Sequence, residues 1–263
     1  MGKNELINTK YLLMLVLLVF VVGCDIDFGS FTWMKSERTE QLSAPIAQGS
    51  VLTAESRVGS ITVLGSDTPD CNITAKITAR APTQAEADEL AGQVKIELTP
   101  ADTGLVLEIE KPIHESKRMI NIDLEITVPV QTNLRLESNV GDIAVSNITG
   151  DIYAATDVGK VTCSDVAGNV DLKANVGDVT ARYLSEAESA FNASLETGVG
   201  QIRFTAPANL SATVDASTKI GSVETRLPIT VTGKLVEHQV QGIIGEGTAT
   251  VKLRANVGSI EIE

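Results

Sequence analysis

The residues with the most regular spacing in this chain are glycines, and polar residues that could hold a cation follow them. Glycine recurs every ninth residue from Gly141 to Gly177, followed in turn by Asp, Asp, Lys, Asn and Asp. Nine-residue repeats that bind calcium carry paired glycines and an aspartate at a fixed place, because oxygen ligands must surround the ion. Here the glycines are single and the next position varies. We therefore expect no calcium, no other metal and no cofactor.

The sequence offers no catalytic constellation either. The two histidines, His114 and His238, have neither the spacing of metal ligands nor that of a nucleophile–base pair. The segment 242–247 is rich in glycine, but no lysine follows to hold a phosphate, so it does not match a P-loop. We expect a protein that is not an enzyme. The enzymatic alternative is a polysaccharide lyase or hydrolase on a β-helix, with clustered acids and basic groups on one face.

Cys24 is the residue for which the sequence predicts a covalent modification. Two lysines precede an apolar run from Tyr11 to Val22, and Gly23 and Cys24 follow it. This order is typical of a secretory signal peptide, and the run is too short to be a good membrane span. The last four residues, Val-Val-Gly-Cys, resemble the bacterial lipobox, whose cysteine receives lipid and begins the mature protein. The alternative is ordinary secretory cleavage, with Cys24 incidental.

The lipobox therefore predicts a lipoprotein signal peptide over 1–23 and a lipid anchor at Cys24. The protein would be a membrane-anchored component of the cell envelope, on its periplasmic or cell-surface face. Two further cysteines, Cys71 and Cys163, could form a disulfide in an oxidising compartment. Because Cys163 holds the same place in its repeat as the apolar Leu172, we expect a buried thiol at Cys163 instead.

Composition narrows the class of partner. The chain has 263 residues, of which 43% are hydrophobic and 3% aromatic, and its formal net charge is -13. The acidic balance argues against nucleic acid and against a polybasic membrane-binding surface. A core of Val, Ile, Leu and Ala fits the shortage of aromatic residues, and the length permits one sizeable domain.

Each nine-residue unit has the pattern of a short strand with one buried face. A polar residue and then Ile or Val follow every glycine, and apolar residues continue to alternate with polar ones. The glycine is expected at a corner, where positive φ or a close backbone approach is required. The residues predicted to point inward are Ile143, Val145, Ile152, Val161, Val170, Leu172, Val176 and Val179.

A second period of eighteen residues lies over the first. Alternate glycines end the tripeptides 139–141, 157–159 and 175–177, which read Asn-Val-Gly, Asp-Val-Gly and Asn-Val-Gly. A coil of two strands and two turns explains both periods and predicts a parallel β-solenoid, which we expect to be right-handed. Residues eighteen apart would stack about 4.8 Å apart. Asn139, Asp157 and Asn175 would then form a ladder, which Asp157 should weaken because a carboxylate cannot donate. Chance glycines in a β-sandwich are the alternative fold.

The predicted organisation has four parts. A polar tether over 24–41 follows the signal peptide, then an N-terminal β region over 42–130, and then regular solenoid repeats over 131–263. The last two parts would form one continuous domain, 42–263. One short helix is expected over 83–93, with Thr83 and Glu86 as a capping box, covering the N-terminal end. Strands are predicted over 50–56, 60–64, 72–79, 94–98, 105–110 and 120–128.

The chain stops within a repeat, where Glu261 and Glu263 alternate with isoleucine. We therefore expect the last rung to be an open edge that could accept a partner strand.

Three features together resemble the bacterial putative-adhesin family, a domain-of-unknown-function family of secreted or surface-anchored β-helical proteins. They are the glycine repeat, the lipobox, and the phrase Ile-Thr-Val-Pro at 126–129 leading into Leu-Arg-Leu-Glu-Ser at 134–138. The resemblance covers 42–263. It implies a lipid-anchored adhesin-like module that binds an unknown protein or surface ligand. A periplasmic accessory or sensor protein that pairs with another envelope protein is a further alternative.

Overall fold

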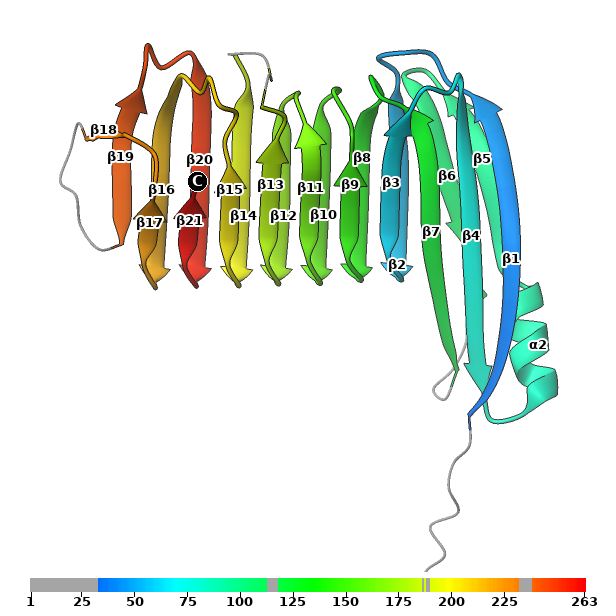
Figure 1. Ribbon diagram of the computed structural model, residues 1–263. Coiled ribbons are helices and arrows are strands. Elements are labelled where there is room, and N and C mark those ends of the chain that lie inside the picture. The colour runs from blue at the N-terminus through cyan, green and yellow to red at the C-terminus, as the bar shows by residue number, and fades with distance from the viewer. Residues whose placement is uncertain (1–32, 113–117, 186, 188–189, 232–237) are drawn as a thin grey trace, which may run out of the picture. The chain divides into compact units, whose positions relative to one another are not determined.

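The computed structural model describes residues 33–112, 118–185, 187, 190–231 and 238–263, which belong to one compact unit beginning at Trp33 (Figure 1). This part of the chain is almost entirely β-structure, with one short helix. Its strands form two long sheets that are mostly parallel within themselves and enclose a common core. The prediction of a mainly β, solenoid-like fold is confirmed at this level.

In spatial order, the first sheet contains β1 (Met34–Pro45), β4 (Asp70–Ala81), β7 (Met119–Pro129), β3 (Ile61–Ser66), β9 (Ile143–Ser146), β11 (Val161–Val166), β13 (Val179–Tyr183), β15 (Ile202–Thr205), β21 (Ile260–Ile262) and β17 (Val223–Thr225). The second contains β18 (Thr230–Val231), β19 (Gln239–Ile244), β16 (Ala212–Ile220), β20 (Ala249–Val257), β14 (Asn192–Val199), β12 (Val170–Val176), β10 (Ile152–Val158), β8 (Asn133–Val140), β2 (Val51–Val58), β6 (Gly104–Glu110) and β5 (Lys95–Ala101).

The eighteen-residue coil is present in the central rungs. Ile152 pairs in parallel with Leu134 on one side and with Val170 on the other, each eighteen residues away. The glycines form the corners. Gly177 has φ +147, and a Cβ built there would lie 1.8 Å from the carbonyl oxygen of Gly159. Only glycine fits this close stacking of backbones.

The sheets are not parallel throughout, which corrects the prediction of a uniform parallel solenoid. In the first sheet β4 pairs antiparallel with both β1 and β7. In the second sheet β5 pairs antiparallel with β6, and β19 pairs antiparallel with β16 and β18. These strands lie outside the central, regularly spaced glycine repeats, so nothing in the local period predicts their direction.

The predicted tether is wrong for residues 34–41, because they form most of β1. β1 is the edge strand of its sheet and pairs with β4 along its whole length. Partly buried and exposed residues alternate along β1, and the partly buried positions include Ser36, Arg38 and Glu40. The segment is therefore a strand although its inner face is largely polar. The segment lacks the apolar alternation that predicts the other strands, so its sequence does not mark it as a strand.

The helix is confirmed at its predicted place. α2 (Gln84–Gly92) begins after Thr83, whose hydroxyl accepts a hydrogen bond from the backbone N–H of Glu86 at 3.3 Å. The helix packs on β1 and β4 and buries Ala87, Leu90 and Ala91. It therefore covers the end of the fold formed by the N-terminal strands, as expected. Within the described residues, no helix has the length and apolar character needed to cross a bilayer.

Seven of the eight predicted inward residues are in the core, and Val176 is not. Val170 and Leu172 are buried, whereas Val176 is 49% exposed. The alternation of β12 fails at its end, where the consecutive residues Asn175 and Val176 both face outward. Buried and exposed residues stop alternating just before the glycine corner. Val176 was predicted to point inward because it is apolar, but it faces solvent.

The C-terminal rung is not an open edge, so that prediction is also wrong. β20 lies between β14 and β16, and β21 lies between β15 and β17. β16, β17 and β19 come before β20 and β21 in the chain. The last two strands nevertheless lie between strands that precede them in sequence. Charge pairs support this insertion: Arg254 contacts Asp215 of β16 at 3.2 Å, and Glu261 contacts Arg203 of β15 at 3.1 Å.

The prediction of a buried thiol at Cys163 is confirmed, and the structure shows the same for Cys71. Cys71 and Cys163 are free and fully buried. Burial raises the pKa of each thiol to about 12. They therefore pack as small apolar groups.

Candidate functional site

Several residues singled out in the sequence lie outside the described part of the chain. Cys24 and the whole signal segment fall there, as does His114, so lipidation stays a prediction. His238 is described, and its Nδ1 lies 2.5 Å from the carbonyl oxygen of Gly221, a contact within a turn region. Among the described residues, no group of three or more His, Cys, Asp or Glu side chains could hold a metal ion.

The most regular surface feature is a row of exposed branched aliphatic side chains along the second sheet. Each stands immediately before a corner glycine and faces solvent, with exposed fractions from 37% to 65%. Adjacent members are paired in register across neighbouring strands. We call this row the aliphatic stripe; in spatial order it consists of Val58, Val140, Val158, Val176, Val199, Val257 and Ile220.

The aliphatic stripe results directly from the corner geometry. The glycine after each stripe residue stacks on the glycine of the neighbouring rung, with φ between +134 and +157 at these corners. The corner therefore fixes the backbone of every rung in the same orientation and aims the preceding side chain at solvent. With strands about 4.8 Å apart, the seven side chains extend over about 29 Å. An exposed apolar row of this length is a feature that usually marks an interaction site.

A polar ladder lies beside the stripe and corrects our expectation for Asp157. The amides of Asn139 and Asn175 both donate to the Asp157 carboxylate, at 3.2 Å and 2.7 Å. A carboxylate between two amides accepts from both sides, so Asp157 links the ladder instead of weakening it. The sequence contained this information, since the acid lies between two asparagines at eighteen-residue spacing.

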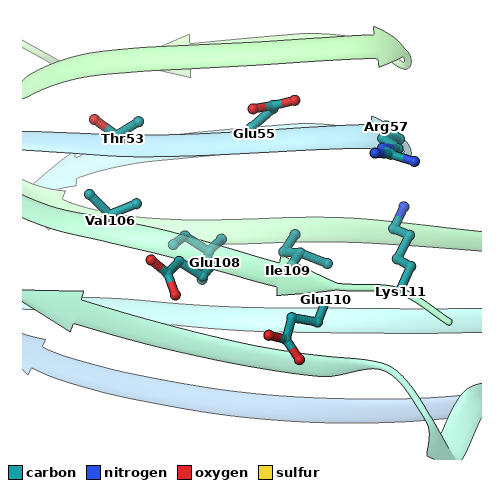
Figure 2. Close-up of a pocket in the computed structure, with 9 residues that line it drawn as sticks. Thr53, Glu55, Arg57, Val106, Glu108, Ile109, Glu110 and Lys111 are labelled. Carbon is teal, nitrogen blue, oxygen red and sulfur yellow. The ribbon is translucent and has the colours of Figure 1, made fainter.

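A second candidate is a groove where two parallel strands separate (Figure 2). β2 and β6 pair only from Val51 to Ala54 on β2, although β2 remains paired with β8 as far as Val58. Beyond Ala54 the two strands enclose a pocket of about 570 Å³. We call it the splayed groove; it is lined by Thr53, Glu55, Arg57, Val106, Leu107, Glu108, Ile109, Glu110 and Lys111.

The positive and negative side chains of the splayed groove lie in different parts of it. Lys111 points toward Arg57 at one end, whereas the carboxylates of Glu55, Glu108 and Glu110 lie away from the Lys111 amine (Figure 2). Glu110 contacts Lys95 at 3.4 Å. The Lys111 Nζ is buried and has no hydrogen-bond partner in the described part of the chain. Burial, and secondarily the nearby Arg57 guanidinium, lowers the pKa of Lys111.

Part of this chain matches a family model, and solved structures resemble the chain at low sequence identity. Residues 120–263 match the family model described as Toastrack DUF4097. Among solved structures, one described as a putative cell adhesion protein from Clostridium sporogenes is 14% identical, with 86% of this chain and 99% of that chain covered and a TM-score of 0.49. A second, described as a putative adhesin from Bacteroides fragilis, is 14% identical, with 87% and 98% covered and a TM-score of 0.38. The comparison with curated proteins finds no match.

Proposed function

The chain belongs to the Toastrack DUF4097 family, and we propose that it is a lipid-anchored, non-enzymatic module that binds a protein partner in the cell envelope. The observation that carries the binding role is the aliphatic stripe. It presents seven branched apolar side chains to solvent along stacked strands, in a chain whose formal net charge is -13. A contiguous exposed apolar surface is typical of an interaction site.

The surroundings of the stripe favour a protein as its partner. The ladder of Asn139, Asp157 and Asn175 runs alongside and offers amide and carboxylate groups. An apolar row beside a polar margin has the composition of a protein–protein interface, with an apolar centre and a hydrogen-bonding rim. The stripe contains no aromatic side chain, unlike the platforms that carbohydrate sites tend to use.

The splayed groove contains both acids and cations, which is the composition expected of the enzymatic alternative. Its carboxylates do not converge on its cations, however, and one of them is engaged by Lys95. A glycoside-cleaving pair would need two carboxyl groups facing a common point. The arrangement therefore favours binding over catalysis.

The binding role can be tested by site-specific photo-cross-linking in intact cells. A photoreactive amino acid at Val176 should yield a cross-linked product, and one at Lys252, which is exposed on another part of the same sheet, should not. The further change V158D should abolish the product while the protein stays folded, because it places a charge within the apolar row. A product of twice the chain's mass would identify a second copy as the partner. Equal products at both positions, or none along the stripe, would refute the role.

The anchor is tested separately. C24S should lose the lipid and no longer show the processed mass of the unaltered protein, because lipidation requires the thiol. Retention of C24S in the membrane, with the same processed mass as the unaltered protein, would contradict the anchor.

A further inference from the structure

Two pockets meet at Arg57 and Lys111. Both residues line the splayed groove, of about 570 Å³. They also line a second pocket of about 410 Å³, together with Val58, Pro112, Arg118, Met119 and Ile120. The two cations therefore stand at the junction between a groove with charged walls and a largely apolar one.

The amine of Lys111 is in an unfavourable state as the structure stands. Its Nζ is buried, and none of its three donor hydrogens has an acceptor. Neither Arg57 nor Lys111 forms an ion pair with any described residue. An unpaired buried charge is strongly unfavourable, and a second cation close by makes it more so. In a chain of net charge -13, a cationic pair without an acidic partner among the described residues is a specific arrangement, and a bound anion would relieve it.

We propose that Arg57 and Lys111 bind a phosphate group, either free or esterified to an apolar substituent. Phosphate suits this pair because the guanidinium can donate two parallel hydrogen bonds and the ammonium can supply a point charge. A phosphate monoester carries nearly two negative charges at neutral pH, which matches two cations better than a carboxylate does. Arg118 lines the apolar pocket and adds a third cation, although Glu86 contacts it at 3.6 Å.

The apolar pocket provides room for a substituent. Met119 is 56% exposed and Val58 is 37% exposed, and both line the pocket next to the cations. An ester lying here would place its phosphate at the cationic pair and its apolar part over these side chains. The site is separate from most of the aliphatic stripe and does not depend on the proposed binding role, although Val58 belongs to both.

The test is isothermal titration calorimetry of the full-length protein in a non-ionic detergent. The probes are butyl phosphate, inorganic phosphate and butyrate, all too short to partition strongly into micelles. We expect saturable binding of butyl phosphate and much weaker binding of butyrate. Tighter binding of butyl phosphate than of inorganic phosphate supports an esterified ligand. Equal affinity also supports the site and identifies the free ion as sufficient.

Three variants make the test specific. K111M and R57Q should each weaken phosphate binding about tenfold or more, since each removes a charge-assisted hydrogen bond. The matched control K219M removes an exposed lysine at the far end of the stripe and should leave binding unchanged. K111M should also retain or raise the melting temperature of the ligand-free protein, because it removes an unpaired buried charge. R57Q changes an exposed residue, so the test does not depend on the folding of K111M.

Three results would overturn the proposal. The first is no saturable binding of either phosphate compound. The second is equal binding by K219M and by both site variants. The third is butyrate binding as tight as that of butyl phosphate, which would make the pair a carboxylate site. None of these results bears on the cross-linking at the stripe, so the two proposals can fail independently.

Discussion

The outward position of Val176 can be tested against the inward position of Val170 with one substitution at two places in a single strand. Both are valines of β12, and alanine removes the same two methyl groups from each. Val170 is 2% exposed and lies in the core between Ile152 and Ala193, whereas Val176 is 49% exposed. V170A loses the burial of both methyl groups and leaves a cavity, so the free energy of unfolding should fall by about 2–3 kcal/mol. V176A should cost less than about 1 kcal/mol, because half of its surface is already in water.

Thermal denaturation monitored by circular dichroism measures the difference. In a domain of this size, 1 kcal/mol corresponds to a shift of about 2–4 °C. V170A should therefore lower the melting temperature by about 4–12 °C, and V176A by no more than about 4 °C. Equal losses for the two variants, or a larger loss for V176A, would show that Val176 is buried and that the aliphatic stripe does not exist as described.

Three further predictions address the corners, the thiols and the inserted rung. G177A should destabilise the protein severely or prevent folding, since its Cβ would meet backbone at 1.8 Å; G92A, with nothing within 4 Å, is the control and should be neutral or stabilising. Cys71 and Cys163 should resist a thiol reagent in the native protein and react after denaturation, as judged by peptide mass, because burial raises the pKa of both to about 12; rapid native labelling would contradict their burial. Hydrogen bonding from Glu263, and then from a neighbouring arginine, lowers the pKa of Glu261, so its stabilisation is present above the unfolded pKa and is lost as pH falls through the lowered value. The melting temperatures of E261Q and the unaltered protein should thus differ at pH 7 and converge as the pH falls through the lowered pKa of Glu261; a difference that stays constant into acid would show that the charge of Glu261 does not hold the rung.

Local patterns in the sequence were enough to predict the central rungs and the helix. The spacing of Gly141, Gly159 and Gly177 fixes the register, because a stacked corner tolerates no side chain and must recur once per coil. The alternation of apolar residues then orients Val170 and Leu172 inward. Similarly, the hydroxyl of Thr83 satisfies a backbone N–H within its own helix, so the helix start needs no information from the rest of the chain.

The candidate surfaces could be predicted only in part. The valine before each corner glycine is visible in the sequence, but an apolar residue type by itself indicates burial, and only the backbone at the corner shows that Val176 points to solvent. The cationic pair joins Arg57 and Lys111, which are 54 positions apart in the sequence. Their meeting depends on where β2 and β6 cease to pair.

The sequence alone determined the eighteen-residue register, most of the residues that fill the core of the central rungs, and the buried position of Cys163, because these depend on neighbours along the chain or one coil away. The tertiary structure decided the order of the strands. β20 and β21 come last in the chain yet lie between strands that precede them in sequence. There Arg254 pairs with Asp215 of β16, and Glu261 pairs with Arg203 of β15. It also decided that the polar residues of β1 form a strand and that β2 and β6 separate to form a groove. Such choices are made by hydrogen bonding and charge between segments far apart in sequence, and a local repeat contains no record of them.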